Sequence, residues 1–158
     1  MDIDRINFIV TPLVAAIVGF AVWYFQSRIE ALRRAQEHLH DDRRKVYSEI
    51  LEPFIRIFAG INNEGESKKA MQHLLSVEYK RTAFEFTLIG ADEVVGSFNN
   101  LMKYLYSVED AETPDPKEIM RLWGKFLLQI RINVGNPKTK LKPVDMLRSQ
   151  IKDIDKIL

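Results

Sequence analysis

The longest apolar pattern in the chain is an uncharged run near its start. Residues 6–25, INFIVTPLVAAIVGFAVWYF, are 20 consecutive residues without a charge. A helix of that length reaches about 30 Å, which matches the hydrocarbon core of a bilayer. Trp23 and Tyr24 close the run, and amphipathic rings favour the level of the lipid headgroups. The pattern therefore predicts a transmembrane helix.

Two other interpretations of the run fit its flanks less well. A buried helix of a soluble protein seldom has more than about 14 uncharged residues. A cleaved signal peptide has a basic start, whereas this chain begins Met-Asp-Ile-Asp-Arg and has no small-residue cleavage site after Tyr24. We therefore expect a retained anchor over residues 1–26. Six Arg and Lys residues lie within 26–45 but only Arg5 precedes the run, so the positive-inside rule predicts an outside N-terminus and a cytoplasmic C-terminal part.

Helical periodicity continues beyond the anchor into residues 27–59. One face of this segment is apolar and its other faces carry charges, which is the amphipathic pattern of a helix. The apolar positions are Ile29, Leu32, Leu39, Val46, Ile50 and Ile57. Gln36 and Arg43 interrupt this face, and polar residues buried in an apolar seam specify the register of helix association. The pattern predicts a long stalk helix.

Further helices are predicted downstream, over residues 67–89, 93–108, 116–134 and from about 143 onward. Asp92 and Asp115 are the predicted N-caps of two of them, and Pro116 after Asp115 is a strong start signal. The first carries several apolar residues on one face, namely Met71, Leu74, Val77, Phe84 and Leu88, together with Arg81. The last brings in Met146, Leu147, Ile151 and Ile154.

The predicted fold is all-α, because the β-branched runs are short and lie within helical periods. It consists of an N-terminal transmembrane helix running into a long amphipathic stalk, followed by a cytoplasmic four- to five-helix bundle within residues 27–158.

One stripe of the predicted span combines small and polar residues. Asn7, Thr11, Ala15 and Gly19 recur at every fourth position, so they lie along a single line of the helix. In lipid, small residues permit close approach of helix backbones and polar residues hydrogen-bond between helices. We expect this stripe to mediate self-association or to line a small pore. Chance is the alternative, because Gly, Ala and Thr are common in membrane helices.

Composition and motifs exclude several classes of function. The net charge is +1, so no overall electrostatic attraction to nucleic acid is expected, and the chain has no Cys for a disulfide or a thiolate metal site. His38 and His40 are two residues apart, and on a helix they point about 200° apart, so they cannot share one ion. His73 is interpreted as a partly buried bundle residue. No nucleotide-binding loop, nucleophile elbow or metalloprotease motif is found, and we expect no catalytic site, metal, cofactor or small-molecule substrate.

The segment Leu127–Asn136, LLQIRINVGN, carries a short motif. Arg131 is followed by four residues and then Asn136. This spacing resembles that of the helical ribonuclease superfamily called HEPN, in which Arg and His at the end of a bundle helix bind and polarise the scissile RNA phosphate. Asn136 stands where the resemblance would require His, and an amide does not titrate near neutral pH. The resemblance thus implies a structural or ligand-binding role without cleavage.

More than half of the chain resembles uncharacterised bacterial proteins with one N-terminal span and a helical bundle. The similar segments are DDRRKVYSEILEPFIRIF, FTLIGADEVVGSFNNLMKYL and LLQIRINVGNPKTKLKPVDMLRSQIKDIDK. More specifically, the chain is similar to the small HEPN-like membrane effectors that accompany RNA-targeting CRISPR nucleases and assemble into a ring-shaped pore. That resemblance implies a membrane-perturbing protein of the bacterial inner membrane that forms homo-oligomers, with an RNA-guided defence complex or its guide RNA as a further partner.

Two alternatives remain open. One is a membrane-tethered HEPN-type ribonuclease, with Arg131 as phosphate ligand and His38 or His73 as acid and base; Arg33 and His38 also have the motif spacing, within the stalk. The other is a scaffold that docks a cytoplasmic partner, anionic lipid or RNA through the basic connector, which is Lys138, Lys140 and Lys142.

Overall fold

The computed structural model describes residues 3–59, 64–109, 115–151 and 153–157 of the chain. For part of these ranges it describes the backbone alone, at 3–16, 58–59, 64, 66–67, 71, 108–109 and 156–157. The described residues form helices joined by turns and contain no strand, so the predicted all-α class is confirmed. The chain divides into two units, Met1–His40 and Asp41–Leu158. The finer division into an anchor, 1–26, and a stalk, 27–59, stays a prediction.

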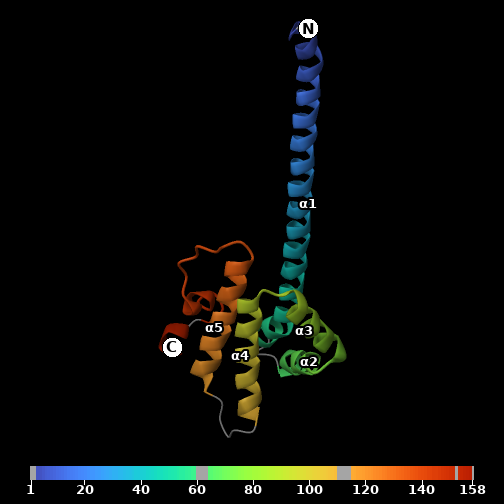
Figure 1. Ribbon diagram of the computed structural model, residues 1–158. Helices are drawn as coiled ribbons and strands as arrows, with labels where there is room; N and C mark the ends of the chain where they lie inside the picture. Colours follow the sequence, from blue (N-terminus) through green and yellow to red (C-terminus); the bar gives the residue numbers. More distant parts are fainter. Residues whose placement is uncertain (1–2, 60–63, 110–114, 152, 158) are drawn as a thin grey trace. The chain divides into compact units, whose positions relative to one another are not determined.

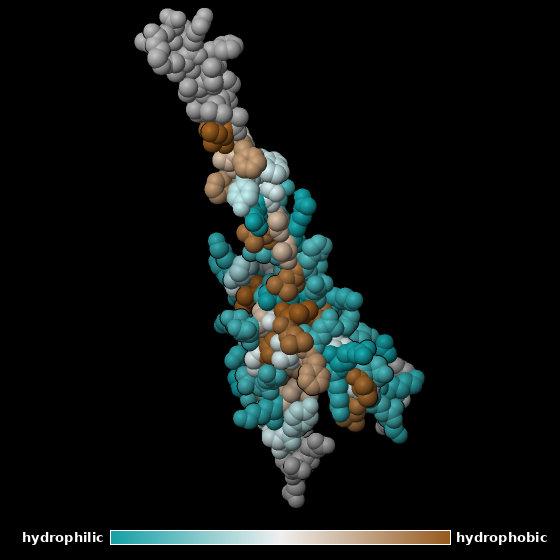
Figure 2. All heavy atoms as spheres, turned by 45° about the vertical axis from the view of Figure 1, so that its right-hand side comes forward, coloured by the Kyte–Doolittle hydropathy of each residue, from teal (hydrophilic) through white to brown (hydrophobic). Residues whose placement is uncertain are grey.

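The first helix, α1, runs from Ile3 to Ala59 and contributes to both units (Figure 1). In the first unit, the described side chains from residue 17 onward include many apolar groups that lie exposed on the helix surface. Figure 2 shows them as brown and pale brown groups below the grey atoms. Among the helices in the described ranges, none combines the length and the apolar character needed to cross a lipid bilayer.

The second unit is a helical bundle, which confirms the prediction of a bundle after the N-terminal segment. After the last part of α1 it contains α2 (Glu64–Leu74), α3 (Val77–Ile89), α4 (Asp92–Glu109), α5 (Pro116–Asn133), the 3-10 turn η1 (Pro143–Met146) and the short α6 (Ile154–Ile157). Helices α4 and α5 pack side by side, α5 also packs against η1, and α2 packs against α3 (Figure 1).

Aromatic side chains from four helices meet in the core of this unit. The ring of Phe86 from α3 lies 5.1 Å from that of Phe98 from α4, which lies 5.3 Å from that of Phe126 from α5. Tyr47 from α1 contacts Phe86 at 5.8 Å, in an edge-to-face arrangement. Such ring pairs add about 1 kcal/mol each to the free energy of burial. Trp123 extends the cluster along α5.

Sequence signals placed the start of α5 correctly. Asp115 is its N-cap, and the Asp115 carboxylate accepts a hydrogen bond from the backbone N–H of Lys117 at 2.9 Å. Pro116 is the first helical residue, where its missing N–H has no cost. Asp92 was also a predicted cap, but it lies inside the first turn of α4, where its negative charge complements the helix dipole.

The single helix predicted over residues 67–89 is wrong, because the chain forms α2 and α3 there with a break at Leu75 and Ser76. The Ser76 hydroxyl oxygen accepts a hydrogen bond from the backbone N–H of Tyr79 at 3.1 Å. Ser is among the best N-cap residues, so it starts a second helix where the apolar periodicity alone continues across the break.

The apolar face predicted from Val77, Phe84 and Leu88 points outward. An apolar stripe on a bundle helix ordinarily faces the core, but these three are among the most exposed of the large apolar side chains that the structure describes. Tyr79 and Phe86, on the opposite side of α3, are buried in their place. Helix α3 is apolar on two sides, and the ring contacts of Phe86 decide which of them turns inward.

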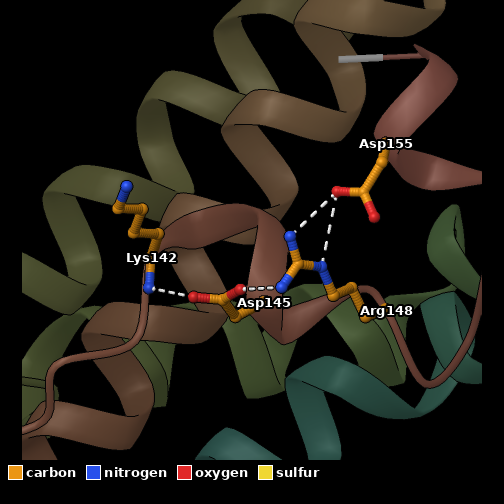
Figure 3. Close-up of polar contacts among 4 residues, drawn as sticks. All are labelled: Lys142, Asp145, Arg148 and Asp155. Atoms are coloured by element: carbon orange, nitrogen blue, oxygen red, sulfur yellow. Dashed lines mark hydrogen bonds and ion pairs between the residues drawn. The ribbon is translucent and has the colours of Figure 1, made fainter.

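The helix predicted from about residue 143 is also wrong. The segment forms η1 and a series of turns before α6, although Leu147 and Ile154 are buried. The Asp145 carboxylate accepts a hydrogen bond from the backbone N–H of Lys142 at 2.7 Å and pairs with Arg148 at 2.8 Å; Arg148 also pairs with Asp155 (Figure 3). These contacts close a compact turn. Hydrogen bonding to Asp155 raises the pKa of the Arg148 guanidinium, which stays charged.

Two helical glycines give a matched test of the packing. A Cβ at Gly124 in α5 would press on the carbonyl group of Pro143, whose carbon lies 2.9 Å away, whereas a Cβ at Gly96 in α4 would meet nothing within 4 Å. We expect Gly124→Ala to lower the free energy of unfolding by about 2 kcal/mol through overpacking. Gly96→Ala should raise it by about 0.5 kcal/mol through helix propensity. Thermal unfolding followed by circular dichroism measures both, and equal effects would contradict the packing of η1 on α5.

Candidate functional site

The polar centre of the second unit is the hydroxyl group of Tyr47. Its side chain is buried, and its hydroxyl donates a hydrogen bond to the side-chain oxygen of Asn133 at 2.9 Å. The Tyr47 hydroxyl oxygen in turn accepts a hydrogen bond from the backbone N–H of Ala91 at 3.0 Å. Asn133 is the last residue of α5, and Ala91 immediately precedes α4. One side chain of α1 thus holds the end of one helix to the start of another.

Two arginines of α1 bind the carboxyl ends of two other helices. Arg43 donates from Nε to the carbonyl oxygen of Ile89, the last residue of α3, at 2.6 Å. Arg44 donates to the carbonyl oxygen of Val134, the C-cap of α5, at 3.2 Å. The last carbonyl groups of a helix have no hydrogen-bond partner within it and carry partial negative charge. An arginine there donates the missing hydrogen bond and places a positive charge beside the negative end of the helix dipole. We name Arg43, Arg44 and Tyr47 with these partners the α1 junction.

The α1 junction was missed by the sequence interpretation. Gln36 and Arg43 were expected to be polar residues of a stalk seam between copies. Gln36 is exposed in a single copy, so its place in a seam stays a prediction, whereas Arg43 is bonded within the chain. The local signal was Arg43, which interrupts the apolar face, with Arg44 directly after it. Their acceptors lie 46 and 90 residues further along the chain, and periodicity contains no information about such partners.

Arg131 and Asn136, the residues of the HEPN-like motif, lie on either side of the end of α5. The backbone N–H of Asn136 donates to the carbonyl oxygen of Arg131 at 3.2 Å, after a turn in which Gly135 has a φ of +124°. The half-buried Arg131 donates from Nε to the Thr139 hydroxyl at 3.2 Å. The motif residues therefore join α5 to the segment that follows, and Arg131 holds that segment through its hydrogen bond to Thr139.

The basic connector extends from this turn. Lys138, Lys140 and Lys142 are all exposed, whereas Thr139 between them is partly buried. The Thr139 hydroxyl oxygen also accepts a hydrogen bond from the backbone N–H of Leu141 at 3.4 Å. The connector thus presents three cationic side chains on an ordered backbone, and its predicted docking role stays a prediction.

The remaining predicted positions lie in α1 and α2. Asn7, Thr11 and Ala15 belong to α1 by their backbone, but their side chains lie outside the described residues. Gly19 is described, and no atom lies within 4 Å of a Cβ built on it. His38 is exposed on α1, and no group of three or more metal-ligating side chains occurs among the described residues.

His73 is exposed, contrary to the prediction of a partly buried histidine. It lines an open cavity with Glu49, Glu52, Glu78 and Tyr79, and its ring lies 5.9 Å from that of Tyr79. Burial raises the pKa of the Tyr79 phenol above its ordinary value, so this group stays protonated. Arg131 is not among the residues that line the cavity, so the structure does not bring His73 into one site with the motif arginine.

Comparison with known proteins gives no match to any family model, curated sequence or solved structure.

The contacts of the α1 junction predict that removing the Tyr47 hydroxyl lowers the free energy of unfolding. Tyr47→Phe keeps the ring but leaves the N–H of Ala91 and the side chain of Asn133 without their partner. We expect a loss of about 2 kcal/mol in the free energy of unfolding, because buried polar groups without a hydrogen bond are costly. Tyr106→Phe, at an exposed tyrosine, is the control and should change little. Similar unfolding curves for the two variants would contradict the role of Tyr47.

Proposed function

We propose that this chain is a single-span protein of the bacterial inner membrane. It would form homo-oligomers through α1 and perturb the membrane as an effector of antiviral defence.

The observation that carries the proposal is the exposure of large apolar side chains on every side of α1 within the predicted span. Phe20, Trp23 and Phe25 are 66%, 61% and 65% exposed. The four successive residues 22–25 are all exposed, and at 100° per residue they cover the helix circumference. Water is a poor solvent for such a surface, and lipid is a good one.

The C-terminal end of this apolar surface carries side chains that are typical of a membrane interface. Arg28 lies one turn after Tyr24, with its guanidinium carbon 5.5 Å from the centre of the Tyr24 ring and its Nε 3.4 Å from the Tyr24 hydroxyl. Aromatic rings and arginines gather at the headgroup level, where one end of each side chain is apolar and the other meets water or phosphate. This supports an end of the span near residue 25.

Self-association is supported by exposed apolar residues of α1 that follow the predicted span. Ile29, Leu32 and Leu39 are exposed along α1, among charged residues such as the Glu30 and Arg34 pair. A helix with an exposed apolar stripe and charged flanks is stabilised by packing against a similar helix. Gly19 leaves room for the close approach of another backbone, as expected of its place in the small-residue stripe.

The defence role rests on the sequence resemblance to pore-forming effectors, as does an RNA-guided complex or its guide RNA as partner. The ribonuclease alternative has less support, because Asn136 cannot exchange a proton and Arg131 is engaged by Thr139. The scaffold alternative rests on the exposed lysines of the basic connector.

Substitutions on two sides of α1 test the proposal. Gly19→Leu adds a large side chain to the stripe, and Ala21→Leu adds the same side chain on the opposite side of the helix. In native mass measurements of the full chain in mild detergent, the wild type and Ala21→Leu should be oligomers, and Gly19→Leu should shift to smaller species. In bacteria that express the chain, a membrane-potential dye should report depolarisation by the first two and much less by Gly19→Leu.

Several outcomes would contradict this proposal. A strictly monomeric wild type would exclude assembly, and identical behaviour of Gly19→Leu would exclude the stripe as the contact. Normal membrane potential at high expression would exclude the effector role. Cleavage of single-stranded RNA by the purified chain, lost in Arg131→Ala, would favour the ribonuclease alternative.

A further inference from the structure

Helix α3 carries an apolar face that no described part of the chain covers. Val77, Phe84 and Leu88 are 76%, 74% and 83% exposed. Their spacing of seven and four residues puts them on one side of the helix, together with Arg81. The buried residues of α3, Tyr79 and Phe86, lie on the other side, so this orientation is fixed by the core. We name Val77, Arg81, Phe84 and Leu88 the α3 face.

The charges on and beside the α3 face are of opposite sign and lie one turn apart. Arg81 and Glu85 are both exposed, and neither forms an ion pair with another described residue. Arg81 lies on the face and Glu85 borders it, on the same flank as Arg81. A surface that combines a stripe of apolar side chains with one cation and one anion can complement itself.

We propose that the α3 face binds the α3 face of a second copy of this chain, with the two helices antiparallel. Placing Val77 of one copy opposite Leu88 of the other brings Arg81 of each copy beside Glu85 of its partner. Because the arrangement is twofold symmetric, each contact occurs twice, and the interface is closed. Arg81 also comes beside the Phe84 ring of the other copy, where a guanidinium is attracted to the aromatic face.

The pattern disfavours the other ways of covering this face. Two parallel α3 helices in register would place Arg81 against Arg81, and like charges at an interface are unfavourable. An anionic lipid surface would gain no net attraction, because the exposed Glu78 and Glu85 offset the exposed Lys80 and Arg81. The antiparallel pair matches Val77 with Leu88, places Arg81 against the Phe84 ring and brings Arg81 beside Glu85, so it avoids the contact between like charges.

This interface goes beyond the proposed function and does not rest on it. All of its residues belong to the second unit, whereas the proposed assembly of α1 involves the small-residue stripe and the exposed apolar positions of the stalk up to Leu39, which belong to the first. A chain with both surfaces would have two different contacts between copies, and repeated use of two contacts builds assemblies larger than a dimer.

Disulfide trapping tests the direction of the pair, and the absence of native cysteine makes the experiment clean. Residues 77 and 88 lie about 16 Å apart along one helix, which is too far for a disulfide within a copy. In the antiparallel pair, position 77 of one copy meets position 88 of the other. The full-length double variant Val77→Cys/Leu88→Cys should therefore give a reducible covalent dimer on oxidation in cells. Neither Val77→Cys nor Leu88→Cys alone should do so.

Charge substitution within the double-cysteine chain tests the chemistry of the contact. Arg81→Glu should reduce the trapped dimer several-fold, and the swap Arg81→Glu/Glu85→Arg should restore it. Circular dichroism is the folding control, and both charges are exposed in the bundle. Trapping should persist with Gly19→Leu added, which separates this contact from the assembly of α1.

Three outcomes would overturn the proposal. Absence of the covalent dimer in the double variant would show that the two faces do not meet. Equal trapping by the single variants would indicate a parallel pair. A covalent adduct whose mass corresponds to a different polypeptide would assign the α3 face to another protein.

Discussion

The Tyr47 hydroxyl is the contact on which the bundle depends. It donates to Asn133 at the end of α5 and accepts from the N–H of Ala91 before α4, while the Tyr47 ring packs on Phe86 of α3. Four helices therefore meet at one buried side chain. A buried hydroxyl with both roles satisfied favours one arrangement of its neighbours, because any other arrangement leaves polar groups without partners. Arg43 and Arg44 extend the constraint, since their cations bind the carboxyl ends of α3 and α5.

Local signals in the sequence predicted the elements whose determinants are local. The cap at Asp115, the helix that follows it and the all-helical class need only a few neighbouring residues. The orientation of α3 could not be predicted, because Val77, Phe84 and Leu88 are as apolar as the buried Tyr79 and Phe86. Ring contacts with distant helices decide between these two sides. The same reason explains why the polar partners of Arg43 and Tyr47 were missed.

The candidate site residues form two groups. Arg131 and Asn136 were predicted from spacing, and they lie at the turn that joins α5 to the basic connector, where Arg131 bonds Thr139. Their contacts are those of a structural turn. The apolar surface of α1 is the second group. No described part of a single copy covers it, and exposed apolar patches are typical of surfaces that bind protein or membrane.

The proposed function depends most on the claim that the start of α1 is embedded in lipid. Alkaline carbonate extraction of envelopes from bacteria producing the full chain tests this claim directly, because it removes proteins bound to the membrane surface and leaves those with a span. The intact chain should remain in the membrane pellet. Its release into the supernatant would contradict the membrane-embedded interpretation.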